Sequence, residues 1–282
     1  MKTVSEVLQL SANYLQERQV ARPRREAEDL LSFILKLSRL ELYLQHERPL
    51  DESELSLYRS YLKRKAQGEP YEYIVGEVPF FRCRFHVAPA VLIPRPETEV
   101  FLERIVFEIQ KKDYSGMVAW DLCCGSGCLG IGLKKALPPL EISLSDLSEQ
   151  ALEIAKANAS MNDVEVCFCQ GDLLSPFNQR KADFVLCNPP YISNQEFDFL
   201  DPSVRLYEPK IALVSGPSGL EFYTRLADGL PDYLNRGAQV FLEIGAGQGV
   251  AVGSIFGAKC WKTKRLEKDW AGHDRFFFLE FE

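Results

Sequence analysis

Four consecutive residues, Asn188, Pro189, Pro190 and Tyr191, have the chemistry to hold a planar amino group. They directly follow the apolar run 182–187, which predicts a buried strand. The two prolines lack N–H groups and fix the backbone, so the turn is stiff. Its carbonyl groups and the Asn188 side-chain oxygen can accept both hydrogens of an NH2 group, while the Tyr191 ring offers a flat wall. A plain proline-rich turn is the alternative.

A glycine loop predicts a site for an adenosine-containing cofactor. Gly125, Gly127 and Gly130 form a G-x-G-x-x-G pattern between a predicted strand and a predicted helix. Glycine permits positive φ and lets the backbone approach a ligand closely. Asp146 ends the next predicted strand, where a carboxylate can accept both ribose hydroxyls. The pattern alone does not separate a nicotinamide dinucleotide from S-adenosylmethionine, and a glycine turn that serves only packing is the alternative.

Two other segments carry related patterns. Asp172, in the turn after the third strand of this region, could accept a hydrogen bond from an adenine amino group. Leu173 could then pack on the ring; a solvated surface turn is the alternative. The Gly-Ala-Gly-Gln-Gly segment 245–249 also follows a strand, but no acidic residue ends a following strand at a comparable distance. We interpret it as a strand-to-helix turn and not as the cofactor loop.

Strands and helices alternate from about residue 117 and must position these groups. The predicted strands are 117–122, 141–147, 164–169, 184–187, 239–244 and 275–281, and the predicted helices are 129–137, 149–159 and 220–234. This alternation predicts an α/β fold with a doubly wound, mostly parallel sheet. Ligands of such sheets lie at the carboxyl ends of the strands, where the glycine loop and Asn188 are both expected.

The beginning of the chain has a different pattern. Residues 1–70 predict a small all-helical domain of four or five short helices, and Asp51 and Glu54 have the spacing of a capping box. Residues 71–98 are rich in aromatic residues and prolines and predict a hairpin linker. Residues 99–282 then form the cofactor-binding domain.

The composition argues against several classes of protein. The 282 residues are 46% hydrophobic and 26% charged, as in soluble globular proteins. A formal net charge of −7 argues against a chain that mainly grips nucleic acid through phosphates. No apolar stretch approaches a membrane span and no signal-peptide core is present, so we expect a cytoplasmic protein. Eight cysteines without a C-x-x-C pair, and three histidines, predict neither a metal site nor a disulfide framework.

The motifs together resemble a known family. The Asp-x-x-x-Gly-x-Gly loop, the acidic end of the second strand and the Asn-Pro-Pro-Tyr turn are similar to those of class I S-adenosylmethionine-dependent amino-methyltransferases. The helical beginning and the segments 68–76, 93–99, 207–213, 218–220 and 272–275 resemble the bacterial release factor glutamine methyltransferases. The resemblance covers essentially the whole chain and implies a seven-stranded class I methyltransferase sheet.

The resemblance also implies an activity, a cofactor and a partner. The family methylates the side-chain amide nitrogen, N5, of the glutamine in the Gly-Gly-Gln motif of class I peptide chain release factors. Residues 188–191 are expected to hold the glutamine, and residues 1–70 to dock the release factor. S-adenosylmethionine is expected to be bound by Cys123, Cys124, Gly125, Ser126, Gly127, Asp146 and Asn188, with Asp172 and Leu173 as candidates for the adenine.

The expected chemistry follows from the nucleophile. An amide nitrogen is a poor nucleophile because its lone pair is delocalised into the carbonyl. Hydrogen bonds to the Asn188 side-chain oxygen and the Pro189 carbonyl would localise electron density on that nitrogen. Orientation and electrostatic stabilisation then supply the acceleration, with Asn188, Pro189 and Tyr191 as the catalytic residues. We assign no general base, since the methylated amide loses its proton readily.

Three other functions remain open at this stage. The same turn would suit an exocyclic amine of DNA or RNA, but such an enzyme needs a basic groove. The basic stretches 22–25, 63–65 and 262–265 are short and acidic residues follow them closely, so we expect no direct nucleic-acid substrate. A nicotinamide-dependent oxidoreductase, or a module that only binds S-adenosylmethionine, would leave residues 188–191 without a task.

Overall fold

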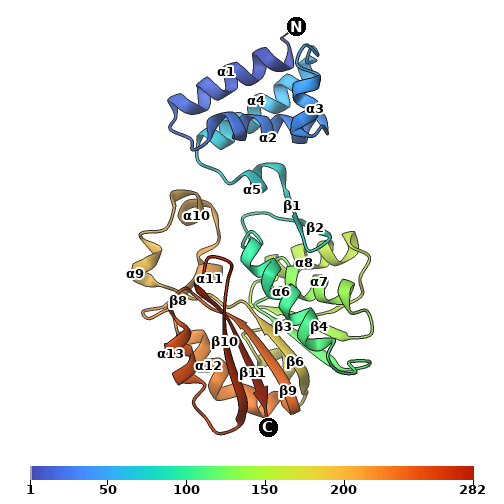
Figure 1. The fold of residues 1–282 in the computed structure, drawn as a ribbon, viewed down its shortest axis with the longest axis vertical. Helices are drawn as coiled ribbons and strands as arrows, with labels where there is room; N and C mark the ends of the chain where they lie inside the picture. Colours follow the sequence, from blue (N-terminus) through green and yellow to red (C-terminus); the bar gives the residue numbers. More distant parts are fainter. Residues whose placement is uncertain (1) are drawn as a thin grey trace. The chain divides into compact units, whose positions relative to one another are not determined.

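The computed structural model describes residues 2–282, which divide into two units (Figure 1). The first unit comprises the chain up to Gly76 together with Asp201–Tyr207, and the second comprises Glu77–Leu200 with Glu208–Glu282. No helix among residues 2–282 is both long enough and apolar enough to cross a membrane.

The first unit is entirely helical. Its helices are α1 (Val4–Glu17), α2 (Pro23–Leu35), α3 (Arg39–Leu44), α4 (Glu52–Ala66), α5 (Tyr71–Val75) and α10 (Pro202–Tyr207). The capping box predicted at Asp51 and Glu54 is confirmed, because each side chain bonds to the other residue's backbone N–H. The apolar faces of α1, α2 and α4 share one buried cluster that includes Leu15, Leu30 and Tyr58.

Helix α5 lies in the segment 71–98, for which the sequence predicts a hairpin linker, yet it belongs to the first unit. Arg64 of α4 holds it there: its guanidinium pairs with Glu69 and donates to the carbonyls of Tyr73 and Ile74. Ile74 is buried in the same cluster as the bundle. The predicted hairpin follows as β1 (Glu77–Phe80) and β2 (Cys83–His86), which pair antiparallel in the second unit.

A seven-stranded sheet forms the centre of the second unit, in the order β10-β11-β9-β6-β3-β4-β5. The strands are β3 (Val118–Leu122), β4 (Glu141–Asp146), β5 (Cys167–Gln170), β6 (Ala182–Cys187), β9 (Leu234–Glu243), β10 (Trp261–Lys268) and β11 (Asp274–Phe281). Strands β9, β6, β3, β4 and β5 are parallel, whereas β11 is antiparallel to both of its neighbours, β9 and the edge strand β10. The predicted seven-stranded, mostly parallel sheet is confirmed.

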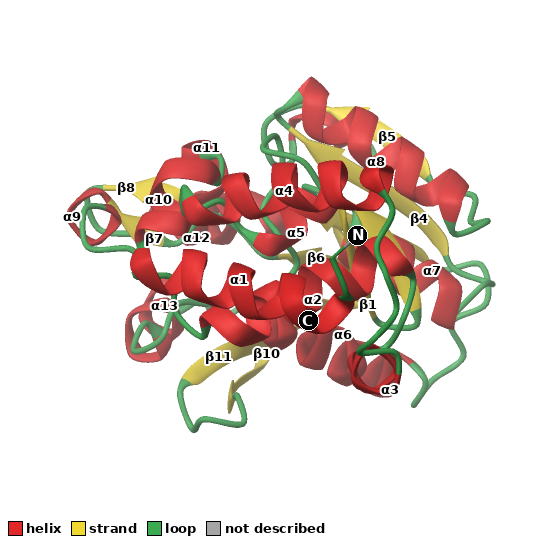
Figure 2. Ribbon diagram, turned by 90° about the horizontal axis from the view of Figure 1, so that it is seen from above, coloured by secondary structure: helices red, strands yellow, loops and turns green. Residues whose placement is uncertain are grey.

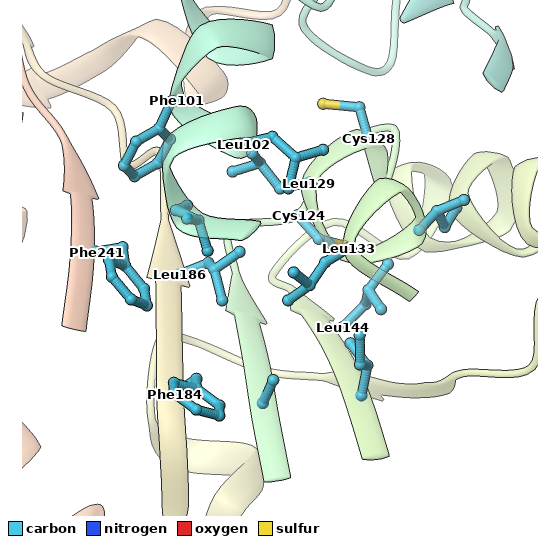
Figure 3. Close-up of a cluster of buried hydrophobic side chains, with 14 of the residues drawn as sticks. Phe101, Leu102, Cys124, Cys128, Leu129, Leu133, Leu144, Phe184, Leu186 and Phe241 are labelled. Carbon is cyan, nitrogen blue, oxygen red and sulfur yellow. The ribbon is translucent and has the colours of Figure 1, made fainter. Parts of the chain in front are cut away.

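Helices cover both faces of this sheet. One face packs against α6 (Pro96–Ile109), α7 (Cys128–Ala136) and α8 (Glu149–Met161), the last of which runs beside β4 and β5 in Figure 2. The other face packs against α12 (Glu221–Gly229) and α13 (Gly249–Ile255). Figure 3 shows the first of these cores, with Phe184 and Leu186 of β6 facing the helices. Successive residues of a strand point to opposite faces, so Val185 and Cys187 fill the other core.

The connection between β6 and α12 contains only short elements. They are β7 (Ile192–Ser193), α9 (Asn194–Phe197), α10, α11 (Lys210–Leu213) and β8 (Val214–Gly216), and β7 pairs with β8. Two 3-10 turns, η1 (Ser175–Phe177) and η2 (Leu230–Tyr233), complete the second unit. The predicted helix 220–234 is shorter than expected, because the α-helix ends at Gly229 and the chain continues as the 3-10 turn η2, which contains a proline.

Strand β10 has no counterpart among the strands predicted from the sequence. Its residues are mostly charged and mostly exposed, so the apolar alternation that reveals a strand is missing. Edge strands commonly carry such charges because they discourage pairing with other chains. The basic stretch 262–265 belongs to this edge strand.

Candidate active site

The strand order of the sheet reverses between β3 and β6. Strands β3, β4 and β5 proceed outward to one edge, and β6 then returns to the opposite side of β3. In open α/β sheets, ligands bind in the crevice at the carboxyl ends of the strands where the order reverses. The loop after β3 and the Asn-Pro-Pro-Tyr turn after β6 both arrive at this point, although 60 or more residues separate them along the chain.

A cavity opens at this switch point, with an empty volume of about 970 Å³ that includes its mouth to solvent. The predicted site residues that line it are Cys123, Cys124, Gly125, Ser126, Asp146, Asp172, Leu173, Asn188 and Pro190. Gly127, Pro189 and Tyr191 are predicted site residues that do not line it. The structure thus brings the glycine loop and the start of the Asn-Pro-Pro-Tyr turn to one cavity.

Asp146 ties the glycine loop to the neighbouring strand. Its carboxylate accepts hydrogen bonds from the backbone N–H of Gly125 and of Ser148, both at 2.9 Å. Gly125 adopts a φ of 53°, and Cys123 a φ of 56°, so the loop needs left-handed geometry at both positions. Burial raises the pKa of Asp146, while its backbone hydrogen bonds oppose that rise. The loop is therefore held open by an acid from β4.

Glycines further along the loop allow close packing of α7. A Cβ atom at Gly127 would come within 2.8 Å of the Ile131 side chain and 3.0 Å of Leu144. A Cβ atom at Gly130 would come within 2.8 Å of the same leucine. The third glycine of the motif therefore serves the contact between helix and sheet, as the G-x-G-x-x-G pattern requires.

Asp121 lines the cavity as well, although it is not among the site residues predicted from the sequence. Its Oδ2 accepts from the Gly130 N–H at 2.8 Å, but its Oδ1 has no hydrogen-bond partner within residues 2–282. The side chain is only 1% exposed, and burial raises its pKa to about 7. A buried acceptor without a partner is costly unless a ligand supplies a donor or a positive charge. Asp121 occupies the first position of the Asp-x-x-x-Gly-x-Gly pattern, and this position is the sequence feature that could have identified it.

The turn after β6 is fixed from two sides. Asn188 is half-buried, and its Nδ2 donates to Thr98 Oγ1 at 3.4 Å. The carbonyl of Tyr191 accepts from Gln248 Nε2 at 2.9 Å. Burial raises the pKa of the Tyr191 hydroxyl to about 12, so the ring stays neutral. Thr98 and Gln248 are supports that no local pattern revealed.

The candidates for the adenine, Asp172 and Leu173, also line the cavity. Asp172 Oδ2 forms an ion pair with Arg225 Nη2 at 2.6 Å, and both side chains are about half exposed. Leu173 is buried and has a φ of 51°. One carboxylate oxygen of Asp172 is thus paired with Arg225, and Leu173 is the apolar side chain of the two candidates.

Arg95, from the loop before α6, also lines the cavity. It pairs with Glu208, a buried carboxylate that also accepts from the Ile93 N–H at 3.2 Å. This pair joins the segments 93–99 and 207–213, which carried the resemblance in the sequence. Residues 2–282 contain no group of three or more metal-ligating side chains, and the eight cysteines are free thiols.

The fold and the site together define a class I methyltransferase. A family model described as "Methyltransferase small domain" matches residues 98–201, and one described as "PrmC N-terminal domain" matches residues 6–76. The solved structure of the 16S rRNA N2 G1207 methyltransferase of Thermus thermophilus has a TM-score of 0.52 at 14% identity. That match covers 73% of this chain and 50% of the other, and it shows the fold alone.

Relatives at higher identity narrow the class to a family. The chain is 43% identical over 277 residues to a release factor glutamine methyltransferase of Chlamydia trachomatis, covering 98% of this chain and 94% of the relative. It is 36% identical over 285 residues to the protein of the same name from Bacillus subtilis, covering 98% and 96%. The chain therefore belongs to the release factor glutamine methyltransferase family.

Proposed function

We propose that this chain transfers a methyl group from S-adenosylmethionine to the side-chain amide nitrogen of the glutamine in the Gly-Gly-Gln motif of class I release factors. The family membership supports the reaction. The observation that carries the proposal is the shared cavity, in which the glycine loop and Asp146 meet Asn188 of the Asn-Pro-Pro-Tyr turn. A glycine loop for the cofactor and an amide oxygen that can accept from an NH2 group, both at one cavity, are what amide methylation requires.

The residues of the cavity fit S-adenosylmethionine, which supplies an electrophilic methyl group on a sulfonium when bound. The unpartnered Oδ1 of Asp121 suits the positively charged part of this molecule. We assign Asp146 to the ribose hydroxyls and the backbone of residues 123–127 to the chain that bears the sulfonium. Leu173 and Asp172 remain the candidates for the adenine.

The turn provides the acceptors for the glutamine amide. We assign the Asn188 Oδ1 and the Pro189 carbonyl to its two N–H groups, which leaves the nitrogen lone pair free to face the methyl group. Pro190 lines the cavity beside them. The ring of Tyr191 lies near Gly245, and its role as a wall for the planar amide remains a prediction. Fixed acceptors stabilise the positive charge that develops on nitrogen and cost no reorganisation during the reaction.

The partner is a protein and not a small molecule. We assign the docking of the release factor to the helical first unit, as the family resemblance implies. We expect the reaction to take place in the cytoplasm, because the proposed substrate acts in translation termination. No general base is assigned, because the product amide releases its proton readily.

Methyl transfer from labelled S-adenosylmethionine tests the proposal. The purified chain is incubated with a release factor, with a Gly-Gly-Gln to Gly-Gly-Ala variant of that factor, with total RNA and with duplex DNA. Label on the wild-type factor alone supports both the substrate class and the target residue. Label on RNA or DNA, with the factor blank, overturns the substrate while the fold and the cofactor assignment stand.

A further inference from the structure

Three polar side chains from distant parts of the chain form a series of hydrogen bonds at the cavity wall. Asn188 Nδ2 donates to Thr98 Oγ1 at 3.4 Å, and Thr98 Oγ1 donates to Glu243 Oε2 at 2.8 Å. Thr98 lies in the first turn of α6, and Glu243 ends β9, the strand next to β6. Thr98 is 2% exposed and Glu243 is 1% exposed, so bulk water has little access to either group.

The chemistry of the three groups gives this series a direction. An ionised carboxylate only accepts hydrogen bonds, so the single hydrogen of the Thr98 hydroxyl must go to Glu243. The lone pairs of that hydroxyl oxygen then remain for the Nδ2 hydrogen of Asn188. Within residues 2–282, Nδ2 is the end of the Asn188 amide that the protein engages. The opposite end of this planar group, Oδ1, is left for a ligand.

We propose that Thr98 and Glu243 are positioning residues that hold the Asn188 amide with Oδ1 available to the substrate. The inference rests on the proposed function, in which Oδ1 accepts one N–H of the glutamine amide. If the Asn188 amide turned by half a revolution, its NH2 would face the substrate NH2, and donor would meet donor. The Thr98–Glu243 pair therefore determines whether Asn188 is an acceptor or a donor at the reacting nitrogen.

Ionisation of Glu243 is a condition of this arrangement. Charged and titratable groups from several elements interact electrostatically with Glu243. They are Arg275 of β11, Arg95 and Glu97 at the start of α6, Cys128 of α7, Tyr191 after β6 and Tyr223 of α12. Burial raises the pKa of Glu243 to about 7, and the hydrogen bond from Thr98 opposes that rise. A protonated Glu243 can donate to Thr98, whose hydrogen is then free for Asn188 Oδ1. We therefore expect turnover to be present above this pKa and to decline as the pH falls through about 7.

The test measures kcat and KM for the release factor at saturating S-adenosylmethionine, over a pH range that spans the pKa of Glu243. Thr98→Val, which keeps the shape and removes the hydroxyl, should lower kcat roughly 10²-fold, the cost of a small misplacement of a reacting group. KM should stay within a few-fold. Thr98→Ser, which restores the hydroxyl, should recover most of kcat.

Glu243→Gln removes the titrating group, so its kcat should be reduced and should no longer fall as the pH drops through about 7. Ser143→Ala is the matched control, since Ser143 is a buried hydroxyl of β4 that bonds to Arg180 away from the cavity. That variant should keep the wild-type kcat. Calorimetric binding of S-adenosylmethionine to each variant reports whether the second unit is folded.

Two results would overturn the positioning role. One is a Thr98→Val variant with wild-type kcat, or with a raised KM as its only change. The other is a Glu243→Gln variant whose pH profile of kcat matches that of the wild type. If Thr98→Val does not fold, this second result alone tests the positioning role. If the wild-type chain labels RNA and not the release factor, the proposed substrate fails, and the same variants test the positioning role on the RNA amine. If the wild type transfers no methyl group to any of these substrates, both the proposed function and the positioning role are wrong.

Discussion

The second unit contains two glycine loops that look alike in sequence and differ in structure. The loop 123–127 follows β3 and the loop 245–249 follows β9, so the two lie on opposite sides of β6 and its Asn-Pro-Pro-Tyr turn. Each leads from a parallel strand into a helix, α7 or α13. Only the first of them contributes residues to the cavity.

The difference lies in what binds the first glycine N–H of each loop. The Gly125 N–H donates to Asp146, a carboxylate from the neighbouring strand, and the loop is held open around a cavity. The Gly245 N–H donates to Gln248 Oε1, a side chain of the same loop, at 2.9 Å. Gln248 Nε2 then donates to the Tyr191 carbonyl. Glycine spacing thus specifies a strand-to-helix turn, whereas an acceptor on the adjacent strand holds such a turn open beside the cavity.

The turn between the two loops should show the largest effect. Asn188→Ala removes the acceptor assigned to the glutamine amide, and we expect turnover to fall roughly 10²–10³-fold. The affinity for S-adenosylmethionine should stay within a few-fold, because the glycine loop is intact. Steady-state kinetics with release factor and calorimetry with cofactor measure the two quantities. Wild-type turnover would show that Asn188 is not catalytic; Asn235→Ala, which loses a bond to Asp183 away from the cavity, is the control.

The acid of the first loop should have the next largest effect. Asp146→Ala removes the carboxylate that holds Gly125 and that we assign to the ribose, and bonds to charged groups contribute about 1.5–3 kcal/mol. The dissociation constant for S-adenosylmethionine should therefore rise by one to two orders of magnitude. Calorimetry on Asp146→Ala and Gln248→Ala compares the two loops directly. An equal loss of cofactor affinity in both would contradict the division of roles.

Gln248, which links the second loop to the Asn-Pro-Pro-Tyr turn, should have a smaller effect when it is replaced. Gln248→Ala removes the bonds to Gly245 and Tyr191, at a net cost of about 1 kcal/mol each. We expect a several-fold lower kcat, a lower melting temperature and unchanged cofactor affinity. Gln248→Glu keeps an acceptor for Gly245 and loses the donor to Tyr191, so it should lower kcat with less effect on stability. If the two variants have the same melting temperature, Gln248 does not close its own loop.

The buried acid at the base of the first loop should change how the stability of the protein depends on pH. The folded pKa of Asp121 is raised to about 7 from 3.8, so its contribution to stability is fully present below the lower value and is lost as the pH rises through about 7. Asp121→Asn does not titrate. We expect this variant to gain a few kcal/mol relative to the wild type between acidic and alkaline pH, at about 1.4 kcal/mol per pKa unit.

Thermal unfolding of the cofactor-free proteins, on both sides of pH 7, measures the Asp121 effect. Gln248→Ala leaves both buried acids, Asp121 and Glu243, in place, so this variant serves as the control and should show no such pH-dependent gain. S-adenosylmethionine should stabilise the wild type more than Asp121→Asn above this pKa, because the cationic ligand favours the ionised carboxylate. Parallel pH profiles for the wild type and Asp121→Asn would contradict the assignment.

Local spacing in the sequence was sufficient for most of the fold. The alternation of apolar runs predicted the parallel strands, and the glycine pattern with Asp146 predicted the loop after β3. Local spacing was insufficient for elements whose structure depends on the segments with which they pair. Strand β10 is a charged edge strand whose pairing with β11 replaces the missing apolar alternation. Residues 201–207 lie within the long connection after β6, yet they fold with the first unit, where Tyr207 donates to the Gln67 carbonyl.

The sequence by itself determined which residues can do chemistry, because φ restrictions, side-chain acceptors and strand ends are local properties. Asn188, Asp146 and the glycines of residues 125–127 could be selected for that reason. The tertiary structure decided how these residues are supported. Thr98 reaches Asn188 across 90 residues and Glu243 across 145, through the placement of α6 and the adjacency of β6 and β9. Hydrogen bonds of this kind depend on strand order and packing, which no spacing along one chain encodes.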